Sequence, residues 1–178
     1  MIVTATGDIL TNAHVVSGAT SVKVTLSNST TAMAATIVSA DNVHDLALLR
    51  VKGQSNLHTV IFGDSSKTVP GDGVIAVGYA LALTGGPTVT AGIISAINRE
   101  ASTETATGAT ETLTGLLQTD APISSGNSGG PLVDSAGHGV GMNTMVATSS
   151  RDTSANGIGF AIAANTITSL LPKLRTGQ

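Results

Sequence analysis

The chain has 178 residues, of which 41% are hydrophobic and 11% are charged, and its formal net charge at pH 7 is −3. It contains no basic block and no interleaving of basic with aromatic residues, which argues against a nucleic-acid partner. The absence of cysteine excludes disulfides, thiolate catalysis and cysteine-ligated metals. No apolar run reaches about 18 residues and the first residues lack the pattern of a signal peptide, so we predict no membrane segment in this chain.

Short β-branched runs separated by Gly, Ser, Thr and Asn predict an all-β protein. Aromatic residues make up only 2% of the chain, so the core must be aliphatic. In the first part of the chain we predict strands at 9–11, 21–26, 32–39 and 46–51, and a short helical turn or loop at 64–69.

The breakers Pro70-Gly71-Asp72-Gly73 predict the main internal boundary, between an N-terminal unit (1–69) and a C-terminal unit (70–178). Apolar residues at helical spacing predict a helix over about 165–175, with Asn165 as its N-cap. In the C-terminal unit we predict strands at 74–79, 89–98, 113–119, 131–133, 139–146 and 158–163.

The stretch Gly126-Asn127-Ser128-Gly129-Gly130-Pro131 places one hydroxyl among small residues, directly before the apolar Leu132-Val133. Glycines allow a tight turn and leave backbone N–H groups unshielded. A serine there can be approached closely beside backbone donors, as acyl transfer requires of a nucleophile and its oxyanion hole. Taken alone, the stretch fits a surface turn equally well.

Two other stretches favour the catalytic interpretation. His14 ends an apolar segment in TNAHVV (11–16), and Asp45 opens an apolar run in HDLALLR (44–50). The chain order His, Asp, Ser is that of the chymotrypsin template, whereas G-x-S-x-G ester hydrolases run from Ser to His. The structural alternatives are that His14 is a core histidine and that Asp45 caps the end of a strand.

In this interpretation Ser128 is the nucleophile, and His14 is the general base and later the acid, because the pKa of an imidazole lies near neutrality. Asp45 fixes the imidazole tautomer and stabilises the imidazolium. The backbone N–H groups of Gly126 and Ser128, with Asn127 between them, form the predicted oxyanion hole. His44, His58 and His138 share no ligand spacing, so we predict no metal site.

Together these motifs resemble the trypsin-like serine proteases, and more closely the HtrA/DegP family, over nearly the whole chain. The resemblance implies two antiparallel β-barrels with the catalytic triad in the cleft between them and a short C-terminal helix. It implies a serine endopeptidase that hydrolyses unfolded or damaged polypeptide through an acyl-enzyme, without a cofactor. The matching stretches are TNAHVV, HDLALLR, LLQTDAPISSGNSGGPLV (116–133) and GIGFAI (157–162).

The chain departs from this family in two places. Family members carry further strand material upstream of Met1, so we expect an unpaired barrel edge and a less stable N-terminal half. Asn127 stands where trypsin relatives carry an aspartate that pairs with a new N-terminal amine, which a neutral amide cannot do. We therefore expect control by loop ordering, with mobile loops at 100–111 and 148–156.

The resemblance also suggests a specificity pocket. Pro122, followed by Ile123, occupies the position of the acid that attracts Lys or Arg in trypsin. Ile158-Gly159-Phe160 resembles the strand that lines this pocket and binds the substrate backbone. An apolar lining predicts a small or medium aliphatic residue (Val, Ile, Ala or Leu) before the scissile bond. Asp120 is expected to be structural.

The resemblance implies an exported or envelope-associated bacterial protein, and trimers are common in the family. Many members carry a C-terminal PDZ domain, which we expect to be absent because the chain ends just past the last predicted helix. The rival hypothesis is a peptide-binding or chaperone-like module with a resting triad. Strand-addition binding would survive loss of Ser128, whereas hydrolysis would not.

Overall fold

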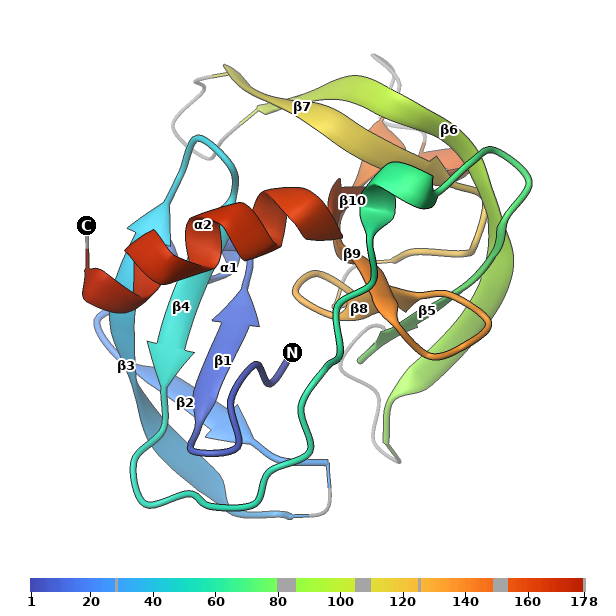
Figure 1. Ribbon diagram of the computed structural model, residues 1–178. Helices are drawn as coiled ribbons and strands as arrows, with labels where there is room; N and C mark the ends of the chain where they lie inside the picture. Colours follow the sequence, from blue (N-terminus) through green and yellow to red (C-terminus); the bar gives the residue numbers. More distant parts are fainter. Residues whose placement is uncertain (28, 80–85, 105–109, 125, 149–153, 178) are drawn as a thin grey trace.

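The computed structural model describes residues 1–27, 29–79, 86–104, 110–124, 126–148 and 154–177 (Figure 1). A curled, open β-sheet from the first part of the chain lies beside a closed β-barrel from the second, and a C-terminal helix packs on both. The predicted all-β class and trypsin-like fold are confirmed, with the sheet open where a second closed barrel was predicted.

The N-terminal sheet has the strand order β1-β4-β3-β2 and is entirely antiparallel. β4 is buried along four consecutive residues, which its continuous apolar run predicted. Four strands spaced about 4.8 Å apart cover too little circumference to close a barrel, so the sheet stays open between β1 and β2. The strands are β1 (Asp8–Thr11), β2 (Val22–Thr25), β3 (Ala32–Asp41) and β4 (Leu46–Arg50).

The outer edge of β1 is not left bare. Ile2 forms an antiparallel bridge with Ile9, and the Leu10 N–H donates to the Met1 carbonyl at 2.8 Å. The chain's first residues thus turn back along β1 and satisfy part of the edge that was expected to be unpaired.

The C-terminal barrel closes in the order β10-β7-β6-β5-β8-β9. Its strands confirm the six predicted ones and extend several of them. They are β5 (Gly73–Gly78), β6 (Thr88–Glu104), β7 (Thr110–Thr119), β8 (Pro131–Val133), β9 (Gly139–Thr148) and β10 (Ser154–Ala163).

The prediction of a loop over residues 100–111 was wrong at both of its ends. β6 runs to Glu104 and β7 starts at Thr110, and the two strands pair there, with a hydrogen bond of 2.8 Å between the Ser102 and Thr112 hydroxyls. Threonine is β-branched and fits a strand surface, so a Thr-rich stretch does not by itself indicate a loop. The loop predicted at 148–156 is likewise shorter than predicted, because β9 ends at Thr148 and pairs there with Ser154, the first residue of β10. Residues 105–109 and 149–153 lie outside the described residues.

Helix α2 (Ala164–Thr176) confirms the predicted C-terminal helix, but its N-cap is Ala163. The side chain of Asn165 instead bridges to the 3-10 turn η1 (Ser65–Lys67), accepting from the Ser65 N–H at 3.1 Å and donating to Asp64 at 2.9 Å. The predicted N-cap role of Asn165 was therefore wrong. The amide anchors the start of the helix to the link between the sheet and the barrel.

Three apolar clusters form the core. One fills the barrel around Val74, Ile94 and Leu132, and another lines the inner face of the N-terminal sheet around Val16 and Leu49. The third joins the sheet, the barrel and α2, and we call it the junction core. It contains Leu10, Leu46, Leu48, Leu113, Leu116, Met142, Phe160, Ile162, Ile167, Leu171 and Leu174.

Candidate active site

His14 and Asp45 come from two neighbouring segments of the N-terminal sheet. His14 lies in α1 (Ala13–Val16), a single turn that follows β1 directly, and its side chain is 47% exposed. Asp45 directly precedes β4 and has φ = 54°, a left-handed conformation that Asp tolerates better than most residues. Because β1 and β4 are paired, the ends of these strands bring the two side chains together.

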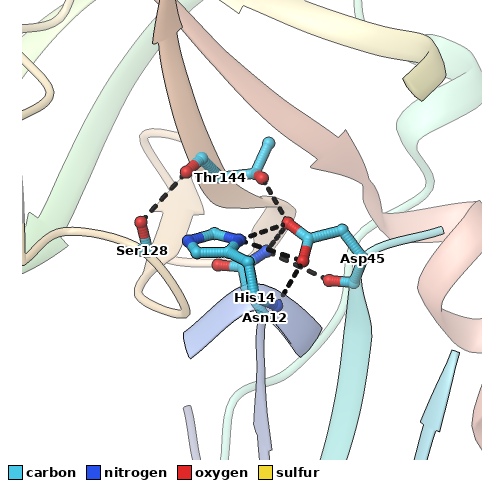
Figure 2. A network of polar contacts seen from close by, with 5 residues as sticks. All are labelled: Asn12, His14, Asp45, Ser128 and Thr144. Carbon is cyan, nitrogen blue, oxygen red and sulfur yellow. Dashed lines mark hydrogen bonds and ion pairs between the residues drawn. The ribbon is translucent and has the colours of Figure 1, made fainter. Parts of the chain in front are cut away.

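The imidazole of His14 is held against the Asp45 carboxylate (Figure 2). His14 Nδ1 lies 2.9 Å from Oδ2 and 3.0 Å from Oδ1 of Asp45, and the His14 backbone N–H donates to Oδ1 at 3.0 Å. A carboxylate only accepts, so Nδ1 carries the proton and Nε2 is the basic nitrogen of the neutral ring. This is the tautomer that a general base needs.

The Asp45 carboxylate is buried and receives two further donors. Asn12 Nδ2 donates to Oδ2 at 2.9 Å, and Thr144 Oγ1 donates to the same oxygen at 2.6 Å. Burial raises the pKa of Asp45, but hydrogen bonds from His14 and Thr144 outweigh it and place the pKa below its ordinary value. Asp45 therefore stays ionised at neutral pH, where it can stabilise a protonated His14.

Ser128 lies on the loop that leads into β8. Gly129 in this loop has φ = 79°, and a Cβ atom there would lie 2.5 Å from Thr11 Oγ1, so only glycine fits without displacing β1. In Figure 2 the His14 ring lies between Asp45 and the Ser128 side chain. The three residues predicted to form a triad are thus brought to one place from two halves of the fold.

The Ser128 hydroxyl is turned toward β9. Its Oγ donates to the Thr144 carbonyl at 2.9 Å, and because a hydroxyl has one proton, this bond must break before His14 can take that proton. Thr144 therefore contacts both the acid and the serine. Sequence reasoning missed it, although a polar pair, Asn143-Thr144, inside an apolar strand was an available signal.

The predicted oxyanion hole lies in the same loop, where Gly126 has φ = 97°. The Asn127 N–H donates to the Ser124 carbonyl at 3.0 Å, so it is already used within the turn. The Asn127 side chain is buried against Gly78, away from the loop surface. The donor role of the Gly126 and Ser128 N–H groups stays a prediction, and the Asn127 N–H contributes to the turn between them.

The predicted pocket residues divide between two environments. Ile123 lies against Gly159, since a Cβ on Gly159 would come within 2.8 Å of Ile123 Cδ1. Phe160 is 8% exposed and belongs to the junction core, and Ile158 packs against that core. Successive strand residues face opposite sides, so Phe160 cannot line the same pocket as Gly159. The Phe160 side chain thus has a core role, and binding of the substrate backbone by residues 158–160 stays a prediction.

A groove of about 570 Å³ runs from Ser128 along α1 and between β1 and β2. Its walls are largely apolar and include Val15, Val22, Val24 and Tyr79.

Among the described residues no cluster of three His, Asp or Glu side chains could hold a metal ion. No helix in the described part of the chain is long and apolar enough to cross a membrane.

A histidine bound through Nδ1 to a buried carboxylate, beside a serine on a glycine-rich loop, is the arrangement found in serine hydrolases. Residues 1–142 match the family model of the trypsin-like peptidase domain, and the chain belongs to this family.

Its relatives include HtrA-type proteases. The chain is 40% identical over 166 residues to the serine protease Do-like HtrB of Bacillus subtilis (93% of this chain, 35% of that protein). It is 43% identical over 169 residues to the serine protease Do-like HtrA of Lactobacillus helveticus (94% of this chain, 40% of that protein). The chain therefore spans well under half the length of these relatives.

Solved structures agree with the fold. The HtrA-type protease AlgW with a tripeptide superposes with a TM-score of 0.84 and 37% identity, covering 98% of this chain and 54% of that one. The serine endoprotease from Yersinia pestis gives a TM-score of 0.80 and 35% identity, covering 98% and 56% of the two chains.

Proposed function

We propose that this chain is a serine endopeptidase that uses Ser128, His14 and Asp45 as its triad. The observation that carries the proposal is the 2.9 Å contact between His14 Nδ1 and the buried Asp45 carboxylate, with Ser128 on the other side of the ring. The names of the relatives, which are serine proteases, support the same reaction.

The reaction begins when Ser128 turns from the Thr144 carbonyl toward His14 Nε2. Nε2 takes the hydroxyl proton while Oγ attacks the carbonyl carbon of the scissile bond, and the new oxyanion accepts from the Gly126 and Ser128 N–H groups. His14 then gives its proton to the departing amine as the C–N bond breaks. His14 then deprotonates a water, which attacks the acyl carbon, and returns the proton to Ser128 Oγ as the acyl C–O bond breaks.

The substrate we propose is an extended segment of unfolded or damaged polypeptide. The largely apolar groove beside Ser128 suits the side chains that such a segment exposes. Ile123, packed against Gly159, supports a small or medium aliphatic residue before the scissile bond. Sequencing the products of an unfolded test protein checks this preference, and cleavage after Lys, Arg or aromatic residues would contradict it.

One observation favours the rival function of a peptide-binding module. The Ser128 hydroxyl donates to the Thr144 carbonyl at 2.9 Å, a contact that the nucleophile must give up before it can attack a substrate. In a binding module the groove would hold peptides without turnover, and binding would survive loss of Ser128.

A fluorophosphonate probe separates the two functions. The probe joins its phosphorus to an activated serine Oγ with loss of fluoride, and intact mass reads the adduct. We expect one adduct on the parent, none on Ser128→Ala, and one on the surface control Ser135→Ala. A folded parent without an adduct would overturn the peptidase proposal and favour the binding module.

The proposed export or envelope location and trimer formation rest on the family resemblance.

A further inference from the structure

We propose that Asn143 is a positioning residue that holds the Ser128 loop in register with the Asp45 carboxylate. The inference rests on the proposed function and adds a residue that does not touch the substrate. Asn143 lies on β9 immediately before Thr144, and its side chain is completely buried.

The backbone of Asn143 clamps the residues that follow Ser128. The Gly129 N–H donates to the Asn143 carbonyl at 3.0 Å, and the Asn143 N–H donates to the Gly130 carbonyl at 2.9 Å. Its side chain continues the same pattern, with Nδ2 lying 3.3 Å from the Pro131 carbonyl and 3.5 Å from the Val77 carbonyl. One residue thus contacts three consecutive positions after the nucleophile and ties them to β5.

The opposite side of the loop is held by the continuation of β5. The Tyr79 N–H donates to the Gly126 carbonyl at 3.3 Å, two residues past Val77. The loop is therefore held on both sides of Ser128: Tyr79 binds the residues before it and Asn143 binds the residues after it. Because Thr144 binds Asp45, a shift of Asn143 moves the nucleophile relative to the acid.

Stability alone does not account for an amide at this position. Asn143 Oδ1 is buried and has no hydrogen-bond partner among the described residues, which is a costly state for a polar atom. A leucine has the same number and branching of side-chain heavy atoms and carries no such oxygen. The Nδ2 donor, which reaches the two carbonyls beside the loop, explains the amide.

Two variants isolate this donor. Asn143→Asp keeps the shape but presents a carboxyl group to the two carbonyls, and Asn143→Leu keeps the branching of the side chain and removes both polar atoms. The matched control is Val140→Ala, which removes buried barrel packing from the same strand without touching the loop. Each variant is compared with the parent for melting temperature, fluorophosphonate labelling rate, and kcat and KM on a peptide.

Near pH 8 we expect both Asn143 variants to lose about tenfold to a hundredfold in labelling rate and kcat, with KM unchanged, because small misplacements of reacting groups are costly. Val140→Ala should lower the melting temperature but keep the labelling rate. A carboxyl group buried beside carbonyl oxygens has a raised pKa, so Asn143→Asp regains an O–H donor on acidification. Its rate relative to the parent should therefore recover toward about pH 6, while that of Asn143→Leu should not.

Amide hydrogen exchange keeps this test independent of the proposed function. Exchange at Gly129 and Gly130 should accelerate in both Asn143 variants and not in Val140→Ala, whether or not the parent is an active enzyme. An unlabelled parent with this exchange pattern would overturn the peptidase and keep the clamp. Unchanged labelling and exchange in folded Asn143 variants, or equal losses in Val140→Ala, would overturn the positioning role.

Discussion

The two halves of the molecule solve the same packing problem in different ways. The barrel closes on itself, so its interior around Ile94 and Leu132 is complete without help from the rest of the chain. The N-terminal sheet is open between β1 and β2. The face opposite its inner one carries Leu46 and Leu48 and is covered by the barrel and α2. The sheet therefore depends on the junction core in a way that the barrel interior does not.

This difference matters because the candidate site lies across the junction. His14 and Asp45 come from the sheet, whereas Ser128 and Thr144 come from the barrel. The hydrogen bond of 2.6 Å between Thr144 and Asp45 crosses directly between the halves. Helix α2 contacts strands of both halves and reinforces the same junction (Figure 1). Changes at the junction should thus alter activity more than equally destabilising changes inside the barrel.

The largest expected effect on activity comes from replacing Asp45, the acid that the N-terminal sheet contributes to the site. Asp45→Asn removes the charge and can stabilise the wrong His14 tautomer, so we expect turnover to fall about 10⁴-fold, as for the same change in the chymotrypsin triad. Steady-state peptide hydrolysis measures it, with circular dichroism to confirm the fold. A loss below about tenfold would mean that Asp45 does not orient the base.

A pair of core truncations tests the dependence on the junction. Leu48→Ala in the junction core and Ile94→Ala in the barrel interior remove fully buried side chains, and each should cost about 2–5 kcal/mol of unfolding free energy. When labelling is measured well below the melting temperatures of both variants, only Leu48→Ala should also lower the fluorophosphonate labelling rate. Urea denaturation gives the stabilities. Equal labelling losses in both variants would show that the site responds to stability in general.

The bond across the junction can be removed by itself. Thr144→Val keeps the shape but removes the donor to Asp45, and we expect a loss of about 1.5–3 kcal/mol of unfolding free energy, typical of a hydrogen bond to a charged group. Thr144→Ser retains the hydroxyl and is the matched control. If valine and serine behaved alike, the Thr144 hydroxyl would contribute nothing across the junction.

The same pair predicts a pH dependence with a definite sign. The pKa of Asp45 is lowered in the folded protein from an ordinary value of 3.8, so its contribution to stability is present above that value and is lost as pH falls through the folded pKa. Removing the Thr144 donor brings the folded pKa closer to the ordinary value. The stability difference between Thr144→Val and the parent should therefore be largest above pH 3.8 and shrink on further acidification. A difference that grows in acid would contradict this assignment.

The sequence predicted those parts of the site whose residues sit in recognisable local patterns. His14, Asp45 and Ser128 each flank an apolar run or a glycine-rich turn, so their segments could be identified singly. Thr144 could not, because its partner Asp45 is distant in sequence and the contact exists only once the two halves pack. The core position of the Phe160 side chain could not be predicted for a similar reason. A strand pattern gives alternation but does not say which face meets the junction core.

The smallest expected effect concerns an ion pair at the far end of the junction. Asp8 on β1 is bound by Arg50 Nε at 2.7 Å and, more loosely, by Arg175 Nε of α2 at 3.6 Å. Because the Arg175 side chain is 40% exposed and solvent screens the pair, Arg175→Ala should cost at most about 1 kcal/mol in chemical denaturation. Arg50→Ala should cost more, since it leaves the largely buried Asp8 carboxylate with only the longer contact. A greater loss from Arg175→Ala would mean that the helix end, and not the pairing of β1 with β4, holds this side of the open sheet in place.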